Sequence, residues 1–139
     1  MKVSLFVIVA ALVATIALGC SADEATKTIQ VSIDEVLNQS AITRDVTLKV
    51  GDTLKVALGS NHTTPYRWTP DPKLSDPTVL KQTSHEFVEG KRGVGVPGTE
   101  VWMFRATKGG TTTIVAQYAG IGGTNTAPTC TFTATVTVQ

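Results

Sequence analysis

The sequence predicts an all-β protein, an immunoglobulin-like β-sandwich that follows an N-terminal export signal. Several short segments alternate polar and apolar residues with a period of two, and turn residues separate them at intervals of about 8–12 residues. This spacing is typical of a sandwich or barrel, and the sandwich of the immunoglobulin type is our choice. Of the 139 residues, 120 follow residue 19, which is the size of one domain with its own core.

The first half of this body contains two strands that alternate clearly. Residues 45–50 and 53–58 have the pattern of half-buried strands, and the turn pair Gly51-Asp52 separates them. We also expect a first strand at residues 28–33 and at most one helical turn at residues 34–38. The side chains expected to face inward are Val46, Leu48, Val50, Leu54, Val56 and Leu58.

The second half contains strands of two kinds. Residues 79–83 and 85–88 are short and polar enough to lie at sheet edges, whereas residues 101–106 and 112–118 are apolar enough to be central. Residues 132–138 alternate over the whole segment and place threonines on the outward face, where β-branched side chains pack well.

The N-terminus has the pattern of an export signal rather than that of a membrane span. Lys2 precedes an uncharged apolar run at residues 5–18, which is shorter than the roughly 20 residues that cross a bilayer. The run ends in Ala17-Leu18-Gly19-Cys20, which is similar to a bacterial lipobox and predicts lipid modification of Cys20. The alternative is an ordinary signal peptide that is cut nearby, for instance after Ala22.

This pattern divides the chain into three parts. We expect residues 1–19 to be a signal peptide, residues 20–27 a lipidated polar tether, and residues 28–139 the folded domain. Two or more acyl chains hold a protein stably on a bilayer. The protein would then be an exported lipoprotein of the cell envelope, anchored to the membrane through Cys20 on the periplasmic or cell-surface side.

The charge of the body is balanced. The whole chain has 12 Lys and Arg against 11 Asp and Glu, and Lys2 leaves with the signal peptide. A nucleic-acid partner would need a basic face, so none is expected. With Cys20 modified, Cys130 is the remaining cysteine and no intrachain disulfide is available. Apolar burial and hydrogen bonds must hold the fold, and we expect a monomer.

Cys130 is the one candidate nucleophile, with His62 or His85 as its base. Its parity with Phe132 in the last strand points it to the core, where a cysteine behaves as a small hydrophobic residue. Two histidines are too few for a metal site. We expect His62 to face solvent on a loop and His85 to lie on an edge strand, with no catalytic residue, metal or cofactor.

The most specific pattern of the chain is a loop between two expected strands, Asn61-His62-Thr63-Thr64-Pro65-Tyr66, called the Asn61 loop below. It resembles, with two departures, the Asn-Pro-Thr-Thr-Gly-aromatic loop of the chagasin family, whose members are small β-sandwich inhibitors of papain-like cysteine peptidases. His62 stands where the family has Pro, and Pro65 stands where it has Gly. Because proline is fixed at a φ of about −65°, Pro65 cannot copy a positive φ.

Trp68 follows two residues after Tyr66, as it does in the family. Alternation puts the two rings on one face of the strand. We therefore expect them to form core and to support the base of the Asn61 loop.

A second segment, Gly93-Val94-Gly95-Val96-Pro97-Gly98, is called the glycine-rich loop below. The family has such a loop running into a strand with aromatic residues, which here would be residues 101–106. Glycines let a backbone approach another surface closely, and exposed main-chain groups can pair with the wall of a cleft. The resemblance implies that this loop contacts the peptidase.

The third family motif is absent. The family has Arg-Pro-Trp after the strand equivalent to residues 112–118, whereas this chain has Tyr118-Ala119-Gly120-Ile121, called the Tyr118 segment below. A tryptophan of this kind is an aromatic anchor, and its loss could cost a few kcal/mol, or about two decades of affinity. Tyr118 and Ile121 are the candidate replacements.

The resemblance implies a reversible, non-covalent inhibitor of papain-like cysteine endopeptidases and not an enzyme. The three loops would block the active-site cleft, with Thr63 nearest the nucleophile of the peptidase. The alternative is an immunoglobulin-like binding or structural module of the envelope without inhibitory activity, because fold does not fix function. The inhibitor hypothesis requires the Asn61 loop and the glycine-rich loop to lie side by side.

Overall fold

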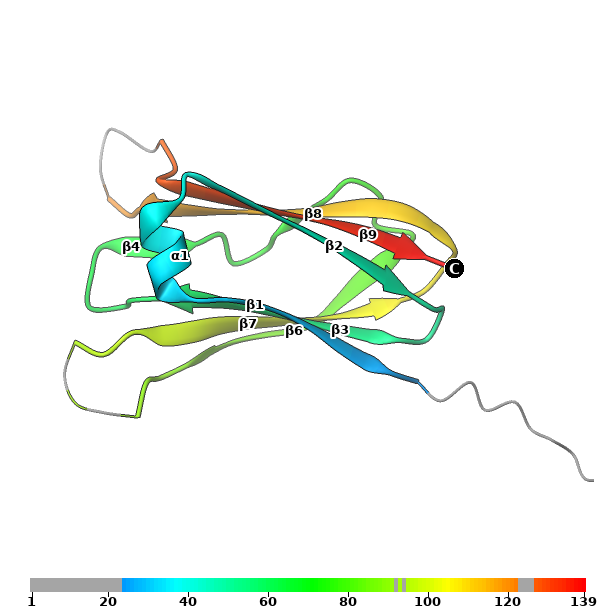
Figure 1. Ribbon diagram of the computed structural model, residues 1–139, viewed down its shortest axis with the longest axis horizontal. Helices are drawn as coiled ribbons and strands as arrows, with labels where there is room; N and C mark the ends of the chain where they lie inside the picture. The colour runs from blue at the N-terminus through cyan, green and yellow to red at the C-terminus, as the bar shows by residue number, and fades with distance from the viewer. Residues whose placement is uncertain (1–23, 92, 94, 123–126) are drawn as a thin grey trace, which may run out of the picture.

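The computed structural model describes residues 24–91, 93, 95–122 and 127–139, which form two β-sheets packed face to face (Figure 1). The four-stranded sheet has the order β1 (Thr26–Val31), β3 (Thr53–Ser60), β7 (Gly98–Ala106) and β6 (Leu80–Val88). The five-stranded sheet has the order β2 (Ala41–Leu48), β9 (Cys130–Val138), β8 (Gly110–Gly120) and β4 (Tyr66–Trp68), and β5 (Lys73–Leu74) also pairs with β8. The predicted all-β sandwich is confirmed.

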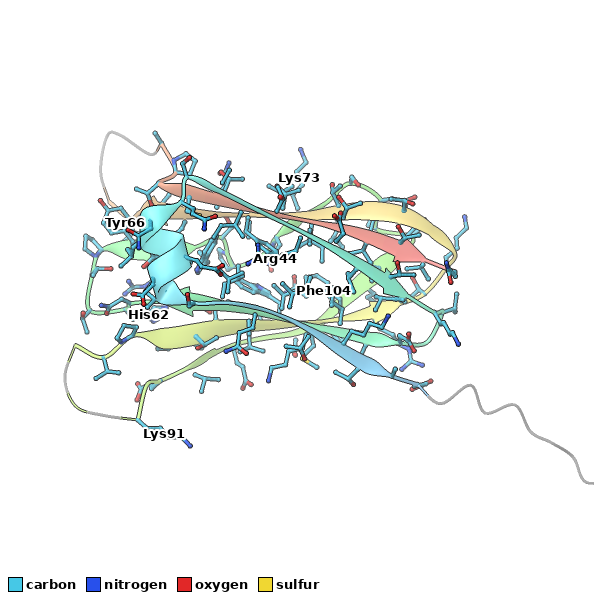
Figure 2. All side chains as sticks on the ribbon, in the orientation of Figure 1. Arg44, His62, Tyr66, Lys73, Lys91 and Phe104 are labelled. Carbon is cyan, nitrogen blue, oxygen red and sulfur yellow. The ribbon has the colours of Figure 1, made fainter. Side chains whose placement is uncertain are left out.

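The core lies between the two sheets and is filled by alternate residues of each strand. In β9 every second side chain from Cys130 to Val138 is buried, which confirms the predicted inward parity of Cys130 and Phe132. From the opposite sheet, Phe104 projects into the space between the layers (Figure 2). The largest fully buried side chains are Trp102, Tyr118, Phe104 and Phe132.

A short helix, α1 (Ile33–Asn38), carries the chain from β1 in one sheet to β2 in the other. Ser32 ends the extended segment and caps the helix, because its Oγ accepts a hydrogen bond from the backbone N–H of Glu35 at 3.2 Å. Val36 is the buried residue of the helix. This crossover lets β1 run parallel to β3, and β2 parallel to β9.

Several boundaries differ from the expected ones, and β1, for instance, covers Thr26–Val31 rather than residues 28–33. β2 covers Ala41–Leu48 rather than residues 45–50, because the chain turns after Leu48 through Gly51, whose φ is 95°. Val50, expected to face inward, is therefore 50% exposed. The expected edge strands at residues 79–83 and 85–88 are one edge strand, β6, whose register shifts between Gln82 and Ser84.

The sandwich has two ends. β3, β6 and β8 finish at one end, which is called the loop end below, and β1 begins at the other (Figure 1). Thr26 pairs with Thr53, the first residue of β3, so residues 26 and 27 belong to the fold and not to the tether.

The predicted signal peptide, Cys20 and Val94 lie outside the described residues. Within the described part of the chain, no helix has the length and apolar character needed to cross a membrane.

Candidate functional site

Three connections meet at the loop end (Figure 1). They follow β3, β6 and β8, and they contain the Asn61 loop, the glycine-rich loop and the end of the Tyr118 segment. Two segments more than 25 residues apart in the sequence thus become neighbours, as the inhibitor hypothesis requires: one cavity is lined by His62 and Thr63 together with Gly93, Gly95 and Val96.

The Asn61 loop is held by its own side chains. The Oδ1 of Asn61 accepts hydrogen bonds from the backbone N–H of Thr63 at 3.1 Å and from its hydroxyl at 2.6 Å. The carbonyl of Asn61 accepts from the hydroxyl of Thr64 at 2.6 Å and from its backbone N–H at 3.1 Å. An asparagine followed by two threonines at this spacing therefore closes a turn that leaves Thr63 exposed at its tip.

The departure at Pro65 does not strain the loop. No described residue other than glycine has a positive φ, so the Asn61 loop does not use a glycine conformation at this position. The guanidinium of Arg67 reaches back into the loop and donates to the carbonyl of Thr64 at 2.6 Å and to that of His62 at 3.0 Å. These bonds satisfy carbonyls that a turn would otherwise leave unpaired.

The five-stranded sheet supports one side of the Asn61 loop. The backbone N–H of Asn61 donates to the phenolic oxygen of Tyr118 at 3.3 Å, and the backbone N–H of Ile121 donates to the carbonyl of Pro65 at 2.8 Å. Below the loop, the indole N–H of Trp68 donates to the carbonyl of Gly59 at 2.8 Å.

Two expectations for aromatic residues need correction. Tyr118 is 2% exposed, so its side chain is core beneath the loop and cannot serve as an exposed anchor in place of the family tryptophan. Tyr66, expected in the core with Trp68, is 37% exposed, and its ring stacks on that of Tyr118 with centroids 5.8 Å apart. Ile121, which is 58% exposed, is the remaining candidate anchor of the Tyr118 segment. Ala119 and Gly120 are half-buried at the end of β8.

The four-stranded sheet holds the other side of the loop through a cluster that the sequence analysis missed. The Nε2 of His62 lies 2.7 Å from Oε1 of Glu100, and the Nε2 of His85 lies 2.6 Å from Oε2 of the same carboxylate. Glu100 is 5% exposed. The side chain of His62, which is 31% exposed, is thus bound to Glu100 rather than free in solvent, and His85, expected only as an edge-strand residue, shares the same carboxylate.

A signal for this cluster existed in the sequence. Glu100 shares its strand parity with Trp102 and Phe104, and a carboxylate on an inward face requires partners. Nothing in the spacing showed that the partners were His62 and His85.

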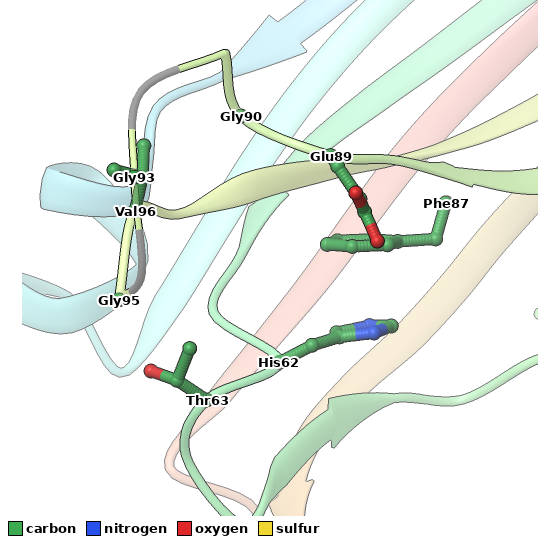
Figure 3. Close-up of a pocket in the computed structure, with 8 residues that line it drawn as sticks. All are labelled: His62, Thr63, Phe87, Glu89, Gly90, Gly93, Gly95 and Val96. Carbon is green, nitrogen blue, oxygen red and sulfur yellow. The ribbon is translucent and has the colours of Figure 1, made fainter.

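The glycine-rich loop lies across a cavity of about 260 Å³ from the Asn61 loop (Figure 3). Gly93 and Gly95 have φ values of 73° and 87°, a backbone region that residues other than glycine rarely adopt. Pro97 and Val96 are exposed, whereas Gly98 is buried as the first residue of β7 and is a structural residue rather than a contact. Figure 3 shows Thr63 on the side of the cavity that faces Gly95.

Apolar side chains are exposed at the loop end on both flanks of the Asn61 loop. A second cavity, of about 440 Å³, is lined by Trp68, Ala119 and Ile121 on one side and by His85 and Glu100 on the other. Within the described residues, the large apolar side chains exposed at this end are Leu37, Tyr66, Val88, Val96 and Ile121. Exposed apolar side chains that gather in this way mark interaction surfaces.

Cys130 does not present a nucleophile at the loop end. The side chain of Cys130 is fully buried, and burial raises the pKa of its thiol, which opposes formation of the reactive thiolate. Within the described residues, no group of three or more His, Cys, Asp and Glu side chains has the arrangement of a metal site.

The loop end of the sandwich therefore presents a self-braced polar loop between two other segments. The family model described as chagasin family peptidase inhibitor I42 matches residues 47–136, and the chain belongs to this family of peptidase inhibitors. The predicted family, and the prediction of an inhibitor rather than an enzyme, are confirmed. A comparison with curated proteins found no match.

Solved structures agree with the fold. The cysteine protease inhibitor EhICP2 from Entamoeba histolytica is 19% identical with a TM-score of 0.66, over 84% of this chain and 98% of that one. PbICP-C, solved in complex with falcipain-2, is 21% identical with a TM-score of 0.59, over 83% of this chain and 99% of that one. Amebosin is 24% identical with a TM-score of 0.54, over 84% of this chain and 98% of that one.

Proposed function

We propose that this protein is a reversible, non-covalent inhibitor of papain-like cysteine endopeptidases that blocks the active-site cleft with its loop end. The observation that carries the proposal is the placement of the Asn61 loop between the other two segments: it shares a cavity with the glycine-rich loop and a backbone hydrogen bond with Ile121. Membership of the chagasin family and the solved complex of PbICP-C with falcipain-2 support it.

The Asn61 loop is suited to block a cleft because it is already ordered. Side chains of the loop satisfy its own turn, and Arg67 holds two of its carbonyls. A loop that is ordered before binding loses little conformational entropy when it binds. Thr63 would enter the centre of the cleft, and the exposed backbone around Gly95 and Ile121 would lie along the two walls.

The inhibition would be non-covalent, because a catalytic cysteine attacks electrophiles and the side chains of the Asn61 loop are not electrophilic. The hydroxyl of Thr63 donates to Oδ1 of Asn61 and that of Thr64 to the carbonyl of Asn61, and these bonds keep the loop closed. The peptidase would be blocked by filled space and excluded substrate.

The predicted lipid anchor fits the orientation of the fold. β1 begins at Thr26, at the end of the sandwich opposite the three loops (Figure 1). A lipid on Cys20 would therefore attach the protein by its far end and leave the loop end directed away from the membrane. We propose an exported protein of the cell envelope on this basis.

The test is a titration of papain with the residue 20–139 body carrying Cys20→Ser, and trypsin serves as a peptidase of another class. We expect inhibition of papain at nanomolar to sub-micromolar concentration, full recovery of activity on dilution, an intact inhibitor chain afterwards and no effect on trypsin. Absence of inhibition of papain and of cathepsin-like peptidases at micromolar concentration would instead favour an envelope module without inhibitory activity.

A further inference from the structure

We propose that Glu100 is a positioning residue of the inhibitor, and that with His62 and His85 it forms a clamp that fixes the Asn61 loop against the strand leaving the glycine-rich loop. These residues, called the His–Glu–His clamp below, join β7, β6 and the loop. The effect of the clamp on inhibition rests on the proposed function. The clamp itself can be tested without a peptidase.

The first reason is that Glu100 is buried and that each of its carboxylate oxygens has a hydrogen-bond partner. An isolated buried carboxylate is costly, so its oxygens need partners. Both oxygens have one: His62 at 2.7 Å and His85 at 2.6 Å. An ionised carboxylate only accepts hydrogen bonds, so the two imidazoles donate. In the described part of the chain, no lysine or arginine forms an ion pair with Glu100.

The second reason is that each imidazole is also held by an aromatic face. The ring of His62 lies parallel to that of Phe87, with centroids 3.5 Å apart and planes 8° apart (Figure 3). The ring of His85 lies on that of Trp102, with centroids 4.9 Å apart and planes 6° apart. A ring that is held both by its face and by its edge keeps one orientation. Because the ring of His62 is held in this way, the backbone of His62 is restricted as well.

The third reason is that His62 joins the two sheets. Its side chain binds Glu100 in the four-stranded sheet, while its carbonyl accepts from Arg67 of β4, in the five-stranded sheet, at 3.0 Å. Thr63 follows directly, so the direction of the loop tip depends on both attachments. Where the family has Pro at this position, the proline ring restricts the backbone; here the clamp supplies the restriction.

The clamp is tested without a peptidase by amide order parameters of Thr63 and Thr64 in the parent and in Glu100→Leu, with Thr111 at the opposite end as the internal control. We expect rigid values of about 0.85 in the parent and values that fall toward about 0.6 in the variant, with Thr111 unchanged. Glu100→Gln, which keeps one acceptor oxygen, should lie between them and carries the test if Glu100→Leu does not fold. Unchanged order in both variants would overturn the clamp.

Inhibition kinetics against papain test its consequence. A loop that visits its binding conformation less often associates more slowly, whereas loss of a direct contact speeds dissociation. We expect Glu100→Leu to associate about tenfold more slowly and to dissociate at the parent rate within about twofold. His62→Ala should slow association by a similar factor. The variant that combines Glu100→Leu with His62→Ala should associate no more slowly than either single variant, and His62→Gln should recover part of the association rate. Additive losses, or unchanged association, would contradict the proposal.

The two hypotheses fail in different ways. If the parent inhibits no papain-like peptidase, the proposed function fails and the order parameters still decide whether the clamp exists. If the parent inhibits papain, and both Glu100→Leu and Glu100→Gln associate with papain as fast as the parent does, the clamp proposal fails while the proposed function stands.

Discussion

The backbone N–H of Ile121 donates to the carbonyl of Pro65 across 2.8 Å, and this bond fixes the Tyr118 segment against the Asn61 loop. The two residues come from connections of different strands, β8 and β3. Because the backbone of Ile121 is fixed, its exposed side chain is presented beside the loop tip rather than left to sample many positions. The third family motif is absent, but its place at the loop end is occupied.

Replacement of Ile121 by alanine should weaken inhibition while the fold remains intact. The side chain is 58% exposed in the free protein and would be buried on the peptidase, so its loss should cost about 1 kcal/mol, or roughly five- to tenfold in the inhibition constant. Val50→Ala is the matched control, since Val50 is 50% exposed at the opposite end. Equal inhibition constants for the two variants would remove Ile121 from the interface.

Removal of the Tyr118 hydroxyl tests support from below the loop. Tyr118→Phe deletes the acceptor of the Asn61 N–H, which lies 3.3 Å away, and should lower the free energy of unfolding by about 0.5–1.5 kcal/mol. Because Tyr118 is 2% exposed, any loss of inhibition must act through the loop. Denaturant unfolding and inhibition of papain measured together check this, and we expect a few-fold loss of inhibition. An unchanged stability would show that the bond contributes nothing.

Alanine substitutions at two glycines of the glycine-rich loop should separate stability from inhibition. A Cβ at Gly98 would overlap the ring of Phe87 and the carbonyl of Val88, so Gly98→Ala should lower stability by about 1–3 kcal/mol. A Cβ at Gly95 meets no atom within 4 Å, but its φ of 87° costs about 1–2 kcal/mol for an L-residue.

The exposed loop can relax at Gly95, so Gly95→Ala should leave the thermal midpoint almost unchanged and weaken inhibition about tenfold. Thermal unfolding and inhibition assays of both variants check the pair. A large drop in the midpoint for Gly95→Ala would contradict the account.

At the far end, Asp52 should make stability depend on pH. Its carboxylate accepts from the backbone N–H of Lys49 at 2.8 Å and of Ala25 at 3.0 Å, and these bonds, that of Lys49 first, hold its pKa below the usual 3.8. A lowered folded pKa gives stability that is present above the ordinary value and is lost as the pH falls through the folded value.

Asp52→Asn should therefore be less stable than the parent at pH 7, and the difference should shrink below about pH 3.8. Urea unfolding across pH 2–7 measures this difference in stability, and Asp45→Asn, at an exposed position of β2, is the control. A difference that stays constant over this range would rule out the assigned hydrogen bonds.

Local patterns were sufficient to predict most of the fold. Alternation in residues 53–58 and 132–138 located β3 and β9 and the inward side of each, because burial on one face repeats every second residue. The pairing of strands was not accessible in this way. β2 and β3 are adjacent in the chain yet lie in different sheets, which is decided by the contacts of β2 with β9 over a long separation in sequence.

The site was predictable where a motif is local and not where it depends on distant contacts. The Asn61 loop was expected from its place between two strands, and Asn61, Thr63 and Thr64 bond to one another within it, so the motif and its structure are local. Glu100 and His62 are 38 residues apart and meet because β7 and the end of β3 are neighbours, which no local pattern reveals. The same limit explains why the burial of Tyr118 was missed.

The central claim is that the tip of the Asn61 loop enters the cleft of a papain-like peptidase. Thr63 is exposed at that tip and Thr111 is exposed at the opposite end, so the same substitution at each position separates the site from the rest of the surface. The direct measurement is the inhibition constant of Thr63→Arg and of Thr111→Arg against papain. We expect Thr63→Arg to weaken inhibition at least about a hundredfold with an unchanged thermal midpoint, because a long charged side chain cannot enter a dehydrated cleft without losing its hydration, and Thr111→Arg to match the parent. Equal inhibition by Thr63→Arg and the parent would contradict the claim.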